Sequence, residues 1–410
     1  MATQPRALII GGSVGGLFAA NLLREIGWDV TVFERASEDL AGRGAAIGVT
    51  EELFEVLRRI GVRLDTSAGV VVRSIVALDR AGRITHDVPR WPVTDAWARI
   101  YRPLKETLPA QHFRPATTLA RVEQDADTVT AIFADGSRAQ GELLIGADGI
   151  HSTVRRQFAP QTQPRYAGYV CWRGIVAESE LAEGEQALIL DHLTFCFAQG
   201  EMMVCVPIPR EDEARTGPQR CCYVWYRPVE FETELPALCT DASGRCHGVT
   251  IAPTLIRREV IDDLKAAAAR LFPPTIAGLV ARVDRPLVQA MFDLESPQIV
   301  FGRVALLGDA AFVARPHVIA GVTKAALDAQ ELTDALAGCG GDLAAGLARY
   351  DRERRAFGSD IVAHARYLGA HLQSQTSGEA PPAPRPELIL RDYGAPHLLH
   401  DPVPANRMSA

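Results

Sequence analysis

Residues 6–23 read RALIIGGSVGGLFAANLL, and this segment carries the strongest evidence for the fold class. Its first five residues, Arg6 to Ile10, are mostly apolar, as a buried parallel strand is. After the glycines, apolar and small residues recur at helical spacing, which predicts a helix that packs closely on a sheet. The glycine-rich turn between strand and helix would let backbone N–H groups approach a pyrophosphate at the helix N-terminus.

The turn itself is Gly11 to Gly16, a GxGxxG pattern in which Ser13 replaces the second glycine. Trp28 to Phe33 predicts a second strand, which ends at Glu34, about 20 residues after the turn, where a carboxylate can accept both ribose hydroxyls of an adenosine. This βαβ unit predicts a dinucleotide site, without distinguishing NAD from FAD. Its predicted cofactor contacts are Gly11, Ser13, Val14, Gly16, Glu34 and Arg35.

Two later apolar runs also end in glycine motifs. Glu142 to Ile145 precedes Gly-Ala-Asp-Gly at 146–149, and Val304 to Leu307 precedes Gly-Asp-Ala-Ala at 308–311. Both runs are typical of buried strands that end at a site. Between them, from about 165 to 290, strand patterns and turns predict an antiparallel insertion. Residues 321–337 and 342–370 return to helical periodicity.

Composition narrows the function classes. The chain has 410 residues, of which 47% are hydrophobic, and its 43 basic and 50 acidic side chains give a net charge of −7. These proportions exclude a disordered chain, no apolar run is long enough for a membrane helix, and the acidic balance argues against nucleic-acid partners. Eight cysteines without a CxxC pair indicate reduced thiols in a cytoplasmic protein, and Cys239, Cys246 and His247 lack the second ligand pair of a metal site.

The three glycine motifs in this order resemble the flavoprotein aromatic hydroxylases, the single-component FAD monooxygenases (class A) related to 4-hydroxybenzoate hydroxylase. Shorter segments are similar to the 2,6-dihydroxypyridine 3-monooxygenase branch of that family: Ser13, Tyr169 to Gly174, Val224 to Arg227, Leu238 to Gly244 and Phe312 to His317. The resemblance implies FAD as cofactor and NADH or NADPH as transient reductant. It also implies that Asp148 serves both nucleotides and that Asp309 meets the ribityl chain of FAD.

The resemblance further implies an α/β fold with a discontinuous Rossmann-like FAD-binding domain (GR2 type), an antiparallel-sheet substrate domain and C-terminal helices. We expect the FAD domain at 1–75, 101–164 and 291–370, the last part including the C-terminal helices. The substrate domain is expected at 76–100 and 165–290. Residues 371–410 are expected to form a linker and tail, which would wrap a partner subunit if the protein is a homodimer.

Further site residues follow from the family positions. Arg43 and the backbone of Leu119 are expected at the flavin and the adenine. The helix after Pro316 would direct the amides of Gly321 and Val322 at the flavin pyrimidine. His317 and Pro316 are the predicted catalytic residues, and His317 is the one expected to orient or deprotonate a ring hydroxyl. His192 and Trp225 are predicted to line the substrate pocket.

The predicted activity is hydroxylation of a small hydroxylated aromatic or N-heteroaromatic ring by O₂ through a flavin C4a-hydroperoxide. Two alternatives stay open at this point. One is a flavin enzyme of the same fold that acts on a larger natural-product scaffold, which would need a larger pocket. The other is a non-catalytic FAD-binding protein.

Overall fold

The computed structural model describes residues 4–43, 46–63, 69–90, 92–209, 219–372 and 383–400. At its centre is a six-stranded sheet with the order β19-β20-β12-β1-β2-β8. All neighbouring strands are parallel except the hairpin β19–β20. The strands are β1 Arg6–Ile10, β2 Asp29–Phe33, β8 Phe113–Arg114, β12 Leu143–Gly146, β19 Val300–Phe301 and β20 Val304–Leu306. The three predicted glycine-ended strands are therefore neighbours, β20-β12-β1.

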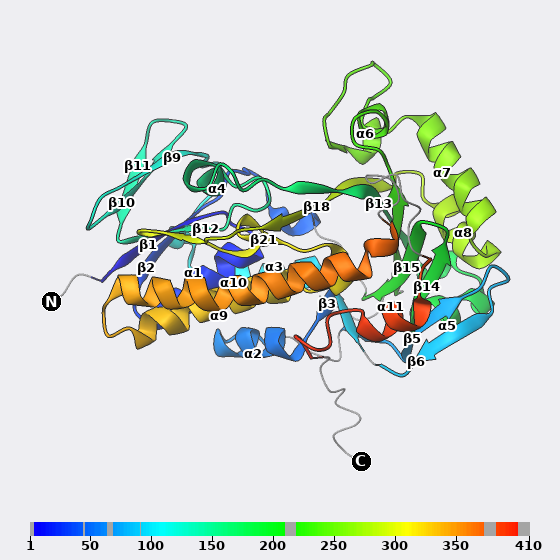
Figure 1. Ribbon diagram of the computed structural model, residues 1–410, viewed down its shortest axis with the longest axis horizontal. Helices are drawn as coiled ribbons and strands as arrows, with labels where there is room; N and C mark the ends of the chain where they lie inside the picture. Colours follow the sequence, from blue (N-terminus) through cyan, green and yellow to red (C-terminus); the bar gives the residue numbers. More distant parts are fainter. Residues whose placement is uncertain are drawn as a thin grey trace, which may run out of the picture.

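Helices α1 Val14–Glu25 and α9 Gly321–Gly338 pack side by side next to this sheet, and α10 Leu343–Leu368 runs along α9 (Figure 1). This confirms the helical periodicity predicted for 321–337 and 342–370. Nearby helices are α2 Glu51–Arg59, α3 Trp97–Thr107 and the short α4 Thr153–Phe158. A small antiparallel sheet, β9 Leu119–Gln124, β10 Val129–Phe133 and β11 Arg138–Gly141, lies at the end of the molecule near the N-terminus.

The second large sheet has nine strands and is mostly antiparallel. Its main path is β17-β18-β13-β16-β15-β14-β5-β6, and β21 pairs with β18. The strands are β5 Ser74–Leu78, β6 Ile84–Val88, β13 Arg165–Ala177, β14 His192–Ala198, β15 Glu201–Ile208, β16 Arg220–Pro228, β17 Thr250–Ile251, β18 Leu287–Glu295 and β21 Phe312–Val313. The predicted hairpin at 193–207 is β14–β15, and β5 joins β14 in parallel. The boundary predicted at residue 290 falls inside β18. The domain boundaries as a whole stay a prediction.

The two faces of this sheet have different surroundings. Alternate residues such as Trp172, Tyr223 and Trp225 pack in one apolar cluster with α7 Arg258–Leu271 and α8 Pro274–Arg282, which cover that face (Figure 1). The short helices α5 Glu183–Leu190 and α6 Glu234–Leu238 lie in the same region. The residues between them, including Cys171 and Tyr226, face the other way. The second face therefore contributes the wall of the site described below.

A third sheet, β3 Ala46–Val49, β7 Val93–Ala96 and β4 Val70–Val71, is short and antiparallel. The C-terminal segment after residue 383 forms α11 Pro386–Asp392 and packs against β5 and β6 of its own chain. Leu390 and Tyr393 are buried there, whereas Leu399 is buried in a separate cluster with Ile361 and Leu368 of α10. Residues 383–400 thus cover their own chain, and the expectation that the tail wraps a partner subunit stays a prediction.

In the part of the chain that the structure describes, no helix has both the length and the apolar character needed to cross a bilayer.

Candidate active site

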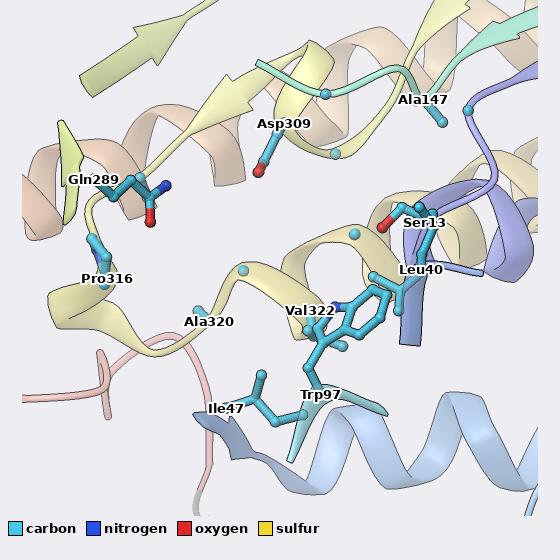
Figure 2. Close-up of a pocket in the computed structure, with 18 of the residues that line it drawn as sticks. Ser13, Leu40, Ile47, Trp97, Ala147, Gln289, Asp309, Pro316, Ala320 and Val322 are labelled. Carbon is cyan, nitrogen blue, oxygen red and sulfur yellow. The ribbon is translucent and has the colours of Figure 1, made fainter. Parts of the chain in front are cut away.

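One cavity connects the glycine motifs with the second sheet. It has a volume of about 670 Å³ and is lined at one end by the turn after β1 and at the other by β14, β15 and β16. Figure 2 shows Ser13 at one side of this space, Asp309 and Gln289 pointing into it, and Trp97 and Ile47 on the opposite wall. A single elongated space thus reaches from the predicted dinucleotide site to the predicted substrate sheet.

Steric limits explain the glycines of the first turn. Gly11 has φ +113°, and a Cβ there would lie 2.3 Å from the carbonyl oxygen of Ala147. A Cβ on Gly16 would lie 1.9 Å from the carbonyl oxygen of Gly11. Gly11 lines the cavity with Ser13 and Val14, whereas Gly16 lies behind the turn and allows the close helix packing. The first turn of α1 has free N–H groups and no acidic side chain. The partial positive charge of this helix end therefore favours binding of an anion.

Glu34 lies at the end of β2, as predicted, and lines the cavity. Its carboxylate is nearly buried and accepts hydrogen bonds from the backbone N–H of Gly12 at 2.7 Å and of Ala36 at 2.8 Å. These two bonds hold the carboxylate against the glycine turn, where a ribose would lie. Arg35 and Leu119 also line this end of the cavity.

Asp148 follows β12 and lines the cavity at the start of α4. Its carboxylate accepts hydrogen bonds from the Thr153 backbone N–H at 2.6 Å and from the Ser152 hydroxyl at 2.5 Å, while removal from water raises its pKa. Arg155 of α4 donates to the carbonyl oxygen of Ala310 at 3.0 Å. This bond ties the second glycine motif to the third, so the two loops keep a fixed spacing.

Asp309 projects from the third motif into the cavity, and its side chain is 54% exposed to that space. Beneath it lies the buried Lys324, whose Nζ is 3.8 Å from a carboxylate oxygen of Asp309 and 3.8 Å from one of Asp328. Asp328 also accepts a hydrogen bond from the backbone N–H of Gly308 at 3.0 Å and one from Arg354 at 2.7 Å. Buried opposite charges therefore fix the loop that carries Asp309.

The segment before α9 forms the floor between the two ends. Pro316, Gly321 and Val322 line the cavity, and a Cβ on Gly321 would meet nothing within 4 Å. Ile319 also lines it, in the left-handed region at φ 43°, which is costly for a β-branched residue and typical of functional loops. Its side chain leaves no room for a Cβ on Gly48, which would lie 2.5 Å away. The start of α9 is thus open to a planar group.

At the second sheet the walls are mainly apolar, with a few polar groups. Leu193, Val204, Val206 and Val224 are the apolar members. The polar members are Arg173, Tyr226, Gln289 and Tyr393. Such a lining suits a small ring that is oriented by a few hydrogen bonds in a place with little water.

The structure corrects the prediction for His317. Its side chain is fully buried and is not part of the cavity wall. Its Nε2 is 2.7 Å from the Tyr169 hydroxyl, and its ring lies 4.5 Å from that of Tyr226, which does face the cavity. Burial lowers the pKa of His317 well below its usual value, so it stays neutral. His317 therefore lies behind the wall, and Pro316 is the member of the pair that reaches the cavity.

His192 and Trp225 are also corrected, because strand alternation places them on the other face of the second sheet. Trp225 packs edge-on against Phe272, and its Nε1 donates to Glu201 at 2.8 Å. His192 bonds to Ser74 through Nδ1 at 3.1 Å. Their neighbours Leu193 and Tyr226 face the cavity instead. The side chain of Arg43 lies outside the described part of the structure.

Sequence reasoning missed Arg173, Gln289, Lys324 and Tyr393. For Arg173 a signal existed, since alternation with the apolar Trp172 places an arginine on the opposite face of β13. Tyr393 gave no signal, because it reaches the cavity only through the folding back of the C-terminal segment.

The cavity fits FAD on these observations, since glycines clear the path of a pyrophosphate and Glu34 and Asp309 face the space that ribose and ribityl hydroxyls would occupy. Comparisons with known proteins agree. The family described as "FAD binding domain" matches residues 4–222, and one described as "FAD binding domain-like" matches 166–293. The 2,6-dihydroxypyridine 3-monooxygenase of Paenarthrobacter nicotinovorans is 32% identical over 336 residues, covering 81% of this chain and 83% of that protein.

Two solved structures extend this likeness to the fold. The 2,6-dihydroxypyridine-3-hydroxylase of Arthrobacter nicotinovorans has a TM-score of 0.85 at 30% identity and covers 93% of this chain and 98% of that one. Klebsiella pneumoniae HpxO, solved with FAD and uric acid, has a TM-score of 0.74 at 26% identity and covers 96% of each chain. With this coverage, the chain belongs to the class A flavoprotein aromatic hydroxylases and is an FAD-dependent monooxygenase that uses NAD(P)H.

Proposed function

We propose that this enzyme hydroxylates a small hydroxylated aromatic or N-heteroaromatic ring, with a hydroxypyridine as the first candidate. The carrying observation is the single cavity that joins the glycine motifs to a small, mostly apolar chamber under the second sheet. The relatives named above that act on dihydroxypyridine support the choice of substrate class. We further propose a cytoplasmic enzyme without nucleic-acid or membrane partners, which could assemble as a homodimer.

When bound and reduced, FAD would activate O₂, so that one of the two oxygen atoms of O₂ enters the ring and the other leaves as water. In our proposal, Gly11, Ser13 and Val14 bind the pyrophosphate, Gly16 allows their close approach, and Glu34 binds the adenosine ribose. We assign the remaining cofactor contacts to Arg35, Arg43, Leu119, Asp148, Asp309, Gly321 and Val322.

The chain's own contribution to hydroxylation is orientation and the exclusion of water. Val204, Val206 and Val224 form one apolar wall and Pro316 closes the floor, so the ring would lie flat between them. The N–H groups at the start of α9 would provide positive potential to a flavin bound there. Both effects favour transfer to the ring over release of peroxide.

The test is oxidation of NADH and NADPH by the purified yellow protein, with peroxide measured in parallel. The panel contains 2,6-dihydroxypyridine, hydroxynicotinates and simple phenols. We expect one compound to accelerate oxidation many-fold with little peroxide. Background rates with every compound would refute the proposed substrate class and favour a larger substrate.

A further inference from the structure

Ile319, on the floor of the cavity, combines a side chain and a backbone conformation that rarely occur together. Its loop also carries Pro316 and Ala320, which Figure 2 shows at the edge of the cavity. In the part of the chain that the structure describes, three residues other than glycine have a positive φ, Ala116, Ile319 and Ala395. Ile319 is the β-branched residue among them, at φ 43° and ψ 19°. A glycine would adopt this conformation without strain, so the reason for isoleucine lies in its side chain.

The Ile319 side chain fits a notch that two glycines leave open. A Cβ on Gly48 of β3 would lie 2.5 Å from the Cδ1 atom of Ile319, and a Cβ on Gly394 of the C-terminal segment would lie 3.3 Å from the same atom. Gly394 has φ +79°, so its backbone favours glycine for a separate reason. Gly48 is not among the described glycines with a positive φ, so it is the contact with Ile319 that excludes a side chain there. The shapes of Ile319 and Gly48 are therefore matched to each other.

This corner belongs to the substrate end of the cavity. Ile319 and Gly48 both line the cavity. Ile319 also packs against an apolar cluster that contains Val224, Tyr226 and Tyr393, which line the chamber. The Ile319 side chain therefore fills the corner where the cavity floor, β3 and the C-terminal segment meet, and it occupies space that a larger ligand would need.

We propose that Ile319 is a specificity-determining residue that restricts the chamber to monocyclic rings. This inference rests on the proposed function and makes it more specific: the enzyme would accept a single aromatic or heteroaromatic ring and exclude a fused bicyclic one. The physical reason is steric. Ile319 lies against the backbone of β3 and of the C-terminal segment, so it cannot move aside for a second ring without displacing one of them. An alanine at this position would remove all of the side chain beyond Cβ and open the corner.

The test measures ring binding to the FAD-loaded enzyme without NAD(P)H, from the change in flavin absorbance on titration. The probes are 2,6-dihydroxypyridine and 1,3-dihydroxyisoquinoline, which keeps both hydroxyls beside the ring nitrogen and adds a fused second ring. The readout is the ratio of the two dissociation constants. We expect the wild type to bind the monocycle more tightly, and Ile319→Ala to shift the ratio roughly 10-fold or more toward the bicycle. Ile319→Val, which removes only Cδ1, should shift it several-fold in the same direction.

Gly48 offers a reciprocal variant. Gly48→Ala would place a methyl group against Cδ1 of Ile319 and push that side chain toward the chamber. In the otherwise wild-type enzyme it should weaken binding of the monocycle several-fold. In the Ile319→Ala enzyme the same methyl group meets no isoleucine, so it should refill part of the corner and return the ratio toward the wild-type value. Two independent structural effects would add instead of reversing each other.

The matched control is Ile361→Ala. Ile361 of α10 is buried in a cluster with Val318 and Ala320 of the same loop, but it does not line the cavity. Its replacement removes the same atoms as Ile319→Ala and should leave the ratio of dissociation constants unchanged. Retained flavin absorbance shows that each variant still holds FAD. If Ile319→Ala does not retain FAD, Ile319→Val and Gly48→Ala decide the question.

The outcomes separate this inference from the proposed function. If the wild type binds the bicycle as tightly as the monocycle, or if Ile319→Ala leaves the ratio unchanged, Ile319 has only a structural role and the inference is wrong. Should the ratio shift as expected while no ring is hydroxylated, the inference stands and the proposed function fails. Binding of neither ring by the wild type and by Ile319→Ala would refute both.

Discussion

Two carboxylates, Asp309 and Glu34, line the cavity, and neighbouring groups hold each of them in place. Asp309 faces the cavity, and Lys324 and Asp328 beneath it are almost completely buried. The carboxylate is thus anchored from below and open from above. At the other end of the cavity Glu34 is held by two backbone N–H groups. In our proposal, these carboxylates accept hydrogen bonds from sugar hydroxyls of the cofactor.

Replacing Asp309 by alanine should strip FAD from the protein, because the variant loses the acceptor that we assign to the ribityl chain. Asp309→Asn, which keeps a carbonyl oxygen, should retain more cofactor. The ratio of absorbance at 450 nm to that at 280 nm after purification measures this directly. A fully yellow Asp309→Ala protein would contradict the assignment.

A second prediction at this scale concerns pH. Burial lowers the pKa of His371 from 6.5 to about 4. Between these pH values the unfolded chain binds a proton at His371 that the folded protein does not bind. The free energy of unfolding therefore falls as the pH drops from about 6.5 towards 4, and above about 6.5 this loss is absent. Between pH 7 and pH 5, the wild type should lose about 2 kcal/mol more unfolding free energy than His371→Gln. Urea titrations at both pH values test this, and equal losses would refute it.

At the level of elements, buried ion pairs join segments that are far apart in the sequence. Asp293 of β18 accepts two hydrogen bonds from Arg315, at 2.9 and 2.7 Å, in the loop before α9. It also accepts one from Arg366 of α10 at 3.3 Å. Both the Arg315 and the Asp293 side chains are almost completely buried. This carboxylate therefore holds the second sheet to the loop that forms the cavity floor.

Asp293→Ala should destabilise the protein by about 3–5 kcal/mol, because it leaves the Arg315 charge buried without its partner. The matched control is Glu295→Ala. Glu295 lies two residues along the same strand and pairs with the same Arg366, but at the surface. That change should cost at most about 1 kcal/mol. Chemical denaturation of both variants measures the difference, and equal costs would show that burial of the pair has no special effect.

Over the whole molecule, the active site is built from segments that lie far apart in the chain. The cofactor end uses the segments around 11–34, 119–148 and 309–322, and the chamber uses strands between 173 and 289. The final contribution is Tyr393, from a segment whose apolar side chains cover β5 and β6. The backbone oxygen of Tyr393 accepts a hydrogen bond from Arg90 at 2.6 Å, which fixes this segment. The C-terminal segment thus closes the chamber.

Truncation after residue 372 should leave FAD bound, because none of the cofactor contacts that we assign lies beyond that point. It should lower the melting temperature by several degrees, since it exposes buried apolar side chains. It should also weaken ring binding at least as much as Tyr393→Phe. Thermal melts and flavin titrations measure these effects. A truncated enzyme that binds the ring like the full chain would show that the segment has no part in the site.

The sequence by itself determined the βαβ unit, the three glycine-ended strands and the family. These features depend on residues that are close together in the sequence. A tight turn next to a phosphate needs glycines at a fixed spacing, and the carboxylate of Glu34 has to follow the end of a strand. The alternation of side chains between the two faces of a strand can also be predicted from the sequence. It does not show which of the two faces lines the cavity. Trp225 and His192 were therefore assigned to the wrong side, and Arg173 was overlooked.

Only the tertiary structure decided what surrounds the ring. His317 follows Pro316 directly, yet the short helical turn between Arg315 and Ile319 directs its side chain into the core, toward Tyr169. Tyr393 enters the chamber because its segment packs on β5, more than 300 residues earlier in the chain. Such contacts depend on burial and long-range packing, which no local pattern encodes. The cofactor site was thus readable along the chain, whereas the substrate chamber exists only once distant segments meet.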